Sequence, residues 1–182
     1  MSKYKIEADN AVLMIIDLQE KLLNAMKDSE KVIKNTNLLL ATAHESGIPV
    51  IVTEQYPRGL GSTVEAIKNN LHEYEYMDKT SFSAWVDEMK EIMNKLGRKT
   101  VILTGSETHV CVFQTARDLV ESGYDVQLVK DAVCSRFDEN YENGIDLMKE
   151  AGAVITNAET VVFDILKKAG TPQFKVISPL LK

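Results

Sequence analysis

The sequence has few of the residues that build disulfide frameworks or membrane spans. Two cysteines, Cys111 and Cys134, occur among 182 residues, which is too few for a disulfide framework and favours a reducing compartment. The longest apolar runs have five or six residues, and a membrane-spanning helix needs roughly 20. The opening segment MSKYKIEADN lacks the apolar region of a signal peptide. We therefore expect a cytoplasmic protein with no membrane partner.

The charge balance argues against nucleic acid as a partner. Asp and Glu number 27 against 21 Lys and Arg, which gives a formal net charge of −6. Proteins that bind phosphate backbones carry clustered basic residues, and this sequence has no such cluster. The composition, 45% hydrophobic and 26% charged, is that of a globular protein. Its length predicts one compact domain over residues 1–182.

Short apolar runs alternate with longer segments of helical period. Apolar runs that predict strands occupy 11–17, 49–53, 100–105, 125–133 and 153–157, with an ambiguous one near 74–77. Helical patterns occupy 30–46, 83–96, 110–122, 140–150 and 160–168. Strands that are apolar on both faces and alternate with helices predict a mostly parallel sheet covered on both sides. The expected fold is a three-layer α/β/α sandwich with a six-stranded, Rossmann-like sheet.

Three polar residues follow strands of this expected sheet. Asp17 ends the first strand, Lys79 follows the third and Cys111 follows the fourth. Ligands of such sheets bind outside the carboxyl ends of the strands, so we expect the three side chains to converge there. Together they offer a proton acceptor, a cation and a nucleophile. Taken singly, each has an ordinary interpretation as a helix cap, a surface lysine or a core cysteine.

Cys111 lies at the mouth of the helix expected over 110–122, after the polar segment TGSETHV. The positive end of the helix dipole stabilises a thiolate, so this position predicts a lowered pKa. The backbone amides of the same turn are suited to receive an oxyanion. Two alternatives stay open: a packed core thiol, and a redox-sensing thiol that pairs with Cys134.

Several segments occur in an order that is specific when they are found together. They are MIIDLQEKLL, DKTSFSAW, LTGSETHVCVFQTARDL, VKDAVCSR and AGAVITNAETVVFDIL. In this order the chain resembles the isochorismatase-like cysteine hydrolases, and TEQYPRGLGST and PQFK are similar to the isochorismatase-domain-containing branch. The resemblance implies Asp17 as general base and acid, Lys79 as charge stabiliser and Cys111 as nucleophile.

The resemblance also implies the surroundings of this triad. It places a cis peptide between Ser106 and Glu107, with the amides of Glu107 and Cys111 forming an oxyanion hole. The expected pocket neighbours are Gln19, Tyr56, Phe82, Trp85 and His109. Members of this superfamily commonly associate, so a homo-oligomer is expected.

No cofactor or metal is expected. Nicotinamidases of the superfamily add a metal site of aspartate and histidines after the second strand, where this chain has TEQYPRGLGST and no histidine before His72. Histidines at 44, 72 and 109 do not offer the ligand set of a zinc site.

The expected reaction is hydrolysis of a C–N bond in a small amide, imide or carbamoyl-type substrate, through a thioester on Cys111. The alternative is a catalytically idle or redox-sensing member of the family that acts as a binding or scaffolding protein. His109 is either a structural loop residue or a partner of the thiol. Arg136 is either structural or a substrate contact, and the sequence leaves its role and that of Cys134 open.

Overall fold

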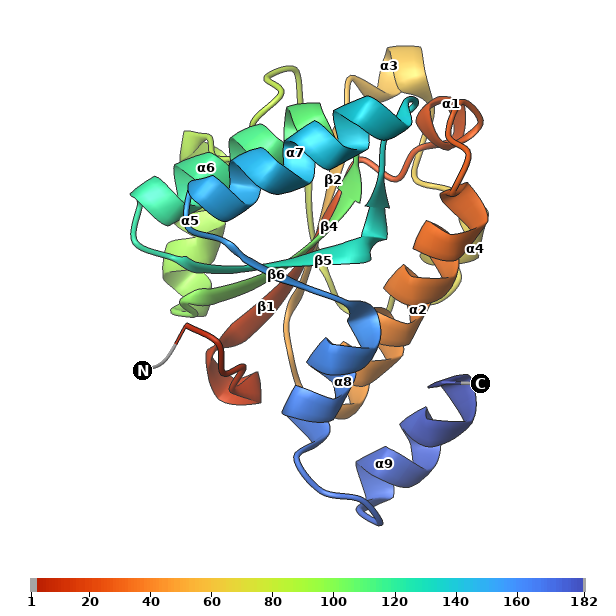
Figure 1. Cartoon of the computed structure of the whole chain (residues 1–182), viewed down its shortest axis with the longest axis vertical. Helices are drawn as coiled ribbons and strands as arrows, with labels where there is room; N and C mark the ends of the chain where they lie inside the picture. The colour runs from red at the N-terminus through yellow and green to blue at the C-terminus, as the bar shows by residue number, and fades with distance from the viewer. Residues whose placement is uncertain (1–2, 182) are drawn as a thin grey trace.

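A parallel six-stranded sheet organises residues 3–181, the part of the chain described by the computed structural model (Figure 1). Its order is β3-β2-β1-β4-β5-β6, and every neighbouring pair is parallel. The strands are β1 (Ala11–Ile16), β2 (Val50–Gln55), β3 (Glu75–Lys79), β4 (Thr100–Ser106), β5 (Asp125–Cys134) and β6 (Val154–Thr156). The predicted α/β class with a six-stranded, Rossmann-like sheet is confirmed.

Helices cover both faces of this sheet (Figure 1). The longer ones are α2 (Ser29–Glu45), α5 (Asp87–Leu96), α6 (Phe113–Glu121), α7 (Asp138–Glu150), α8 (Ala158–Leu166) and α9 (Pro172–Ile177). Single turns form α1 (Glu20–Leu23), α3 (Pro57–Leu60), α4 (Glu65–Lys68), η1 (Ala8–Asn10) and η3 (Ser178–Leu181), and a π-helical turn η2 (Thr108–Val112) leads into α6.

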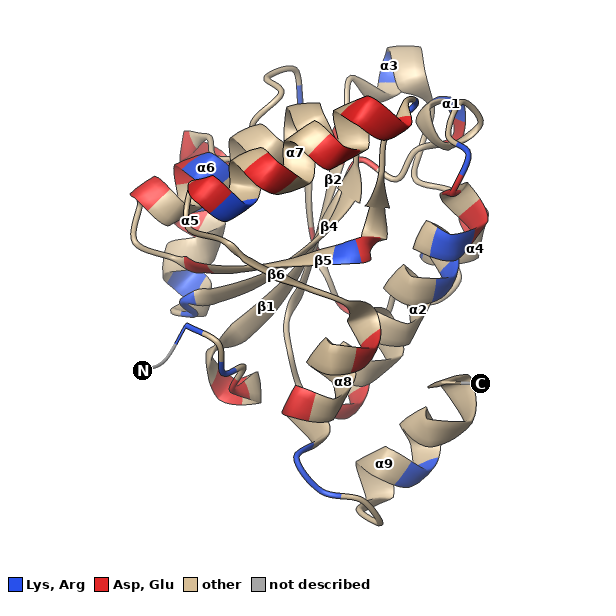
Figure 2. Cartoon of the chain, in the orientation of Figure 1, with Lys and Arg blue, Asp and Glu red and all other residues tan. Residues whose placement is uncertain are grey.

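Two hydrophobic cores lie on opposite faces of the sheet. Successive strand residues point to opposite faces, so Leu13 and Ile15 join the core under α2 and α8, whereas Met14 and Ile16 join the core under α5, α6 and α7. All six residues of β1 are buried, as expected for a central strand of a parallel sheet. Figure 2 shows that most charged residues lie on the surrounding helices and loops.

The boundaries differ from the sequence-based prediction where local contacts decide them. The helix expected from Ser83 begins at Asp87. The Ser83 hydroxyl donates to Asp118 Oδ2 at 2.6 Å and accepts from the Trp85 amide at 3.2 Å, and the segment between Ser83 and the helix contains bends. The helix expected from Val110 starts within the π-helical turn η2 and is α-helical only from Phe113. The last helix expected was 160–168, but a further helix, α9, starts at Pro172, and its first turn is capped by the Thr171 side chain.

Candidate active site

The buried charges of the described residues gather at one edge of the sheet. Asp17, Glu54, Lys79 and Glu107 are the charged side chains buried there, and each lies at or just beyond the carboxyl end of a strand. Strand order reverses between β1 and β4, and the crevice at such a reversal is the usual ligand site of an open α/β sheet. Asp17 follows β1 and Cys111 follows β4, so both flank this point.

Asp17 is fully buried, and both of its carboxylate oxygens have hydrogen-bond donors. Oδ2 accepts from Lys79 Nζ at 2.7 Å, and Oδ1 accepts from the Thr53 hydroxyl at 2.7 Å. Its backbone lies in the left-handed region, with φ of 51°, which aspartate tolerates better than most residues. This conformation ends β1 and turns the carboxylate toward the neighbouring strands.

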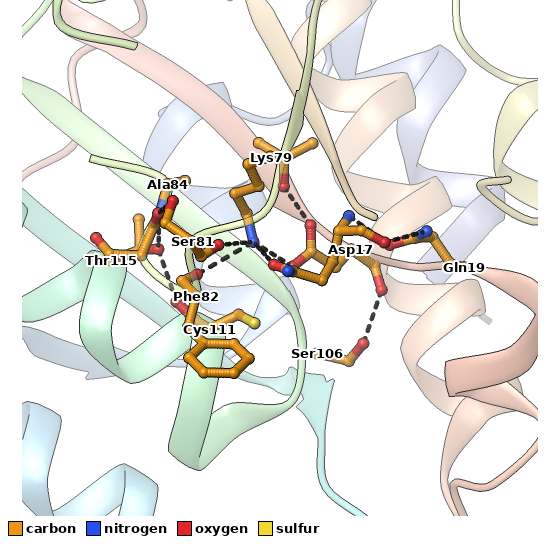
Figure 3. A network of polar contacts seen from close by, with 12 residues as sticks. Asp17, Gln19, Lys79, Ser81, Phe82, Ala84, Ser106, Cys111 and Thr115 are labelled. Carbon is orange, nitrogen blue, oxygen red and sulfur yellow. Dashed lines mark hydrogen bonds and ion pairs between the residues drawn. The ribbon is translucent and has the colours of Figure 1, made fainter. Parts of the chain in front are cut away.

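Lys79 is held by oxygen atoms on several sides (Figure 3). Besides Asp17, its Nζ donates to Gln55 Oε1 at 2.7 Å, to the Phe82 carbonyl at 3.1 Å and to the Ser81 carbonyl at 3.3 Å. The two carbonyls belong to the loop after β3, which folds back over the ammonium group. The lysine is therefore a fixed buried cation, and the alternative of a solvated surface lysine is wrong.

Cys111 lies in η2, and its thiol points toward the Asp17–Lys79 pair (Figure 3). Burial is the main cause that raises the pKa of the Cys111 thiol to about 12, the charge of Asp17 raises it further, and the charge of Lys79 opposes both. The predicted lowering of this pKa is wrong, because the thiol is only 6% exposed, and its desolvation and the charge of Asp17 outweigh the opposing charge of Lys79. The resting residue is a neutral thiol that needs a base.

The turn before Cys111 is fixed against β1. The peptide bond between Ser106 and Glu107 is cis, and the Ser106 hydroxyl donates to the Asp17 carbonyl at 2.8 Å. Gly105 has φ of +133°, and a Cβ there would lie 2.1 Å from the Ile16 carbonyl oxygen. Only glycine allows this approach, so β4 brings the turn directly against the end of β1.

Arg136 is tied to the acidic residue of the same turn. The Glu107 carboxylate accepts from the Arg136 backbone amide at 3.0 Å and from its Nε at 3.2 Å. The Arg136 side chain is 53% exposed, while that of Glu107 is 10% exposed. Arg136 thus neutralises a buried carboxylate and joins the start of α7 to the turn.

The residues expected to line the pocket fall into different environments. Gln19 uses its amide internally, because Nε2 donates to the carbonyls of Gln55 and Gly61 and Oε1 accepts from the Gln55 amide. Tyr56 and Phe82 are each 55% exposed and follow β2 and β3 at the triad's edge of the sheet.

Trp85 and His109 make contacts that do not involve the triad. The Trp85 ring packs edge-on against Tyr124. Tyr124 directly precedes β5, so this contact lies at the amino ends of the strands, away from the triad. His109 Nδ1 lies 3.0 Å from the Ser135 hydroxyl, which matches the structural alternative for this histidine.

The second cysteine lies across the sheet from the first. Cys134 is the register partner of Ser106 and belongs to the core on the α2 face, whereas Cys111 belongs to the other core. Both are free thiols. With side chains on opposite faces, they are not placed to form the redox pair that the sequence left open.

Two residues of β2 belong to the site although the sequence pattern did not predict them. Thr53 donates to Asp17, and Gln55 accepts from Lys79. Their spacing of two residues puts both side chains on the same face of the strand. The sequence does show polar residues at alternate positions where β2 ends, a pattern that could have indicated the site. The apolar residues before Thr53 made this pattern hard to recognise.

Metal ligands do not cluster in the part of the chain that the structure describes: no group of three or more His, Cys, Asp or Glu residues there is placed to hold an ion. In residues 3–181, no helix is both long and apolar enough to span a bilayer.

Comparison with known proteins gives consistent matches. The family model of the isochorismatase domain matches residues 11–160. The secreted isochorismatase effector Isc1 of Phytophthora sojae is 40% identical over 178 residues, which cover 95% of this chain and 85% of the relative. Isochorismatase domain-containing protein 2 of Xenopus laevis is 33% identical over 179 residues, covering 97% and 86%. The structure of MAR1 ribonuclease from Caenorhabditis elegans aligns with a TM-score of 0.92 at 38% identity, covering 97% and 92%.

Proposed function

The chain belongs to the isochorismatase family, and we propose that it is a cysteine hydrolase that cleaves a C–N bond of a small amide, imide or carbamoyl-type substrate. Membership of this family supports hydrolysis as the class of reaction. The observation that carries the finer proposal is the buried arrangement of Asp17, Lys79 and Cys111 at the switch point of the sheet.

The proposed reaction begins with proton transfer. Because the pKa of the Cys111 thiol is raised to about 12, Asp17 accepts its proton as the sulfur attacks the substrate carbonyl carbon. The negative charge that develops on the carbonyl oxygen is received by the backbone amides of Glu107 and Cys111. Asp17 then passes the proton to the leaving nitrogen, the C–N bond breaks and a thioester remains on Cys111.

The second half of the reaction reverses these roles. Water gives a proton to Asp17 as its oxygen attacks the thioester carbon, and the carboxylic acid leaves as the sulfur recovers that proton. Lys79 keeps its position throughout, because four oxygen atoms hold its ammonium group. Its charge offsets that of the buried carboxylate whenever Asp17 is ionised.

A screen for ammonia or amine release tests this proposal. Wild-type protein is incubated with amides, cyclic imides and ureides beside Cys111→Ala, with Cys134→Ala as matched control because its thiol is buried on the opposite face. We expect turnover of at least one substrate by the wild type and by Cys134→Ala, an acyl adduct on Cys111 by mass spectrometry, and no turnover by Cys111→Ala. Equal turnover by folded Cys111→Ala would refute the mechanism.

An RNA substrate belongs in the same screen, because the similar protein from Caenorhabditis elegans is named a ribonuclease. The formal charge of −6 argues against that activity here. Cleavage of RNA that persists in Cys111→Ala would favour the ribonuclease over the cysteine hydrolase.

We also propose that the chain forms a homo-oligomer. Tyr74 and Tyr76 lie at the edge strand β3 and are 44% and 46% exposed. Aromatic side chains of this kind are enriched at protein interfaces. Sedimentation equilibrium measures the mass, and a monomer at all concentrations would contradict this part of the proposal.

A further inference from the structure

Thr53 holds Asp17 at two separate points. The Thr53 carbonyl accepts the Asp17 backbone amide at 3.1 Å, and its hydroxyl donates to Asp17 Oδ1 at 2.7 Å. Both residues are fully buried, so water does not compete for these bonds. The first contact fixes where the chain leaves β1, and the second fixes how the carboxylate is rotated.

The two oxygens of Asp17 consequently have different neighbours. Lys79 occupies Oδ2 and the Thr53 hydroxyl occupies Oδ1. An ionised carboxylate only accepts hydrogen bonds, and a hydroxyl has one proton to donate, so the Thr53 contact gives Oδ1 a fixed donor. It also holds a side-chain torsion that is otherwise broad.

Gln55 acts on Lys79 in the same manner. Its Oε1 accepts from Lys79 Nζ at 2.7 Å, and its Nε2 donates to the Thr80 carbonyl at 2.8 Å, which fixes the orientation of the amide. Strand β2 supplies no reacting group, yet its last three residues contain one contact to each member of the ion pair.

We propose that Thr53 is a positioning residue, whose hydroxyl holds the Asp17 carboxylate in the orientation from which it can accept the proton of Cys111. The inference rests on the proposed function, since it assumes that Asp17 is the base. It assigns to β2 the orientation of the general base, a role that neither the triad residues nor the turn with the Glu107 and Cys111 amides fills.

A matched control lies on the neighbouring side of β1. Thr104 of β4 is also fully buried, but its hydroxyl has no hydrogen-bond partner within residues 3–181. Thr53→Val therefore removes a hydrogen bond to Asp17, whereas Thr104→Val makes the same substitution in a buried strand and removes none. The pair Thr53→Val and Thr104→Val separates the hydrogen bond from the effect of the substitution itself.

The experiment measures two independent quantities in wild type, Thr53→Val, Thr53→Ser and Thr104→Val. The first is the titration of the Asp17 carboxyl carbon by carbon-13 NMR, assigned from its loss in Asp17→Asn. The second is the pH dependence of kcat/KM on a substrate from the screen. Circular dichroism and thermal melting establish that each variant is folded.

We expect Thr53→Val to move the midpoint of the carboxyl titration and the acid limb of kcat/KM upward by about 1 pH unit, because a hydrogen bond to a charged group is lost. At neutral pH we expect kcat to fall about tenfold with KM little changed, since the lost contact acts in the chemical step. Thr53→Ser, which keeps the hydroxyl, should restore both quantities, and Thr104→Val should leave both unchanged.

The outcomes distinguish this inference from the proposed function. An unchanged titration midpoint in folded Thr53→Val, or an equal shift in Thr104→Val, overturns the role of Thr53. If Thr53→Val does not fold, Thr53→Ala takes its place, and an unchanged titration midpoint in folded Thr53→Ala overturns the role of Thr53. A wild type that is inert toward every amide refutes the proposed function instead, and the titration still decides whether the Thr53 hydroxyl acts on the Asp17 carboxylate.

Discussion

Replacing Gly144 by alanine probes how tightly the thiol-bearing turn is fixed. Gly144 lies in α7, and a Cβ there would lie 2.9 Å from both the Cα and the N of His109 and 3.0 Å from the Thr108 carbonyl carbon. These are backbone atoms of η2, two or three residues before Cys111, so no side-chain rotation relieves the clash. Non-bonded carbon atoms settle at about 3.5–4.0 Å, which requires α7 and η2 to separate by about 0.6 Å.

Two opposing contributions determine the change in stability. Alanine is better than glycine inside a helix by about 1 kcal/mol, and inserting a methyl group into a tightly packed contact costs about 1–3 kcal/mol. The free energy of unfolding should therefore fall by an amount between zero and about 2 kcal/mol. Catalysis is more sensitive: a misplacement of about 1 Å can cost a factor of about 100 in rate, so the smaller shift of Cys111 should lower kcat about tenfold.

The assay is urea unfolding followed by circular dichroism, together with the rate of ammonia release. Asn143→Ala is the control, because Asn143 is the preceding residue of the same helix and is exposed. It should leave kcat unchanged and stability equal or slightly higher. If Gly144→Ala instead gains about 1 kcal/mol, the full helix-propensity benefit, and retains full kcat, the contact between α7 and η2 does not position the thiol.

Two further predictions concern the buried ionisable groups. Lys79→Met should lower the free energy of unfolding by about 3–5 kcal/mol, because Asp17 would lose its buried counterion; exposed Lys95→Met is the control in the same urea titration, and equal losses would contradict the reasoning. The pKa of Cys111 and of Cys134 is raised to about 12 from a value of 9.0 by burial, so above pH 9 the unfolded chain binds fewer protons than the folded one and stability falls as the pH rises. Urea unfolding at pH values between 8 and 11 should show this decline. The free energy of unfolding should fall less steeply with pH in Cys134→Ala than in the wild type, and an equally steep fall would contradict the prediction.

The central elements of the fold were predictable from the sequence because they are buried on both sides. β1 is a continuous apolar run, β4 has Val101, Ile102 and Leu103 between threonines, and the predicted positions of both strands agree closely with the structure. β3 is an edge strand with alternating exposure, so its pattern placed it only approximately. Helices such as α1, α3 and α4 have four residues each, which is barely one turn and leaves no period to detect.

The position of the site was predictable because the sheet topology determines it. The properties that depend on burial, such as the pKa of the thiol, were not. Polar residues that follow parallel strands meet at one edge, and this rule pointed to the neighbourhood of Asp17, Lys79 and Cys111. The direction of the thiol's pKa was missed because the dipole argument contains no measure of desolvation. Thr53 was missed because a threonine within an apolar run is ordinary, and only the partner of its hydroxyl distinguishes it from Thr104.

The left-handed backbone at Asp17 restricts which substitutions this position can accept. Glycine, asparagine and aspartate adopt that conformation readily, whereas other side chains are strained in it. Glutamate therefore carries the negative charge but is strained in this conformation, whereas asparagine adopts the conformation but carries no charge. Every uncharged replacement leaves Lys79 without its buried counterion and costs stability, but glycine and asparagine should lose less than alanine or valine, which also strain the backbone. A library selected for turnover should retain aspartate alone.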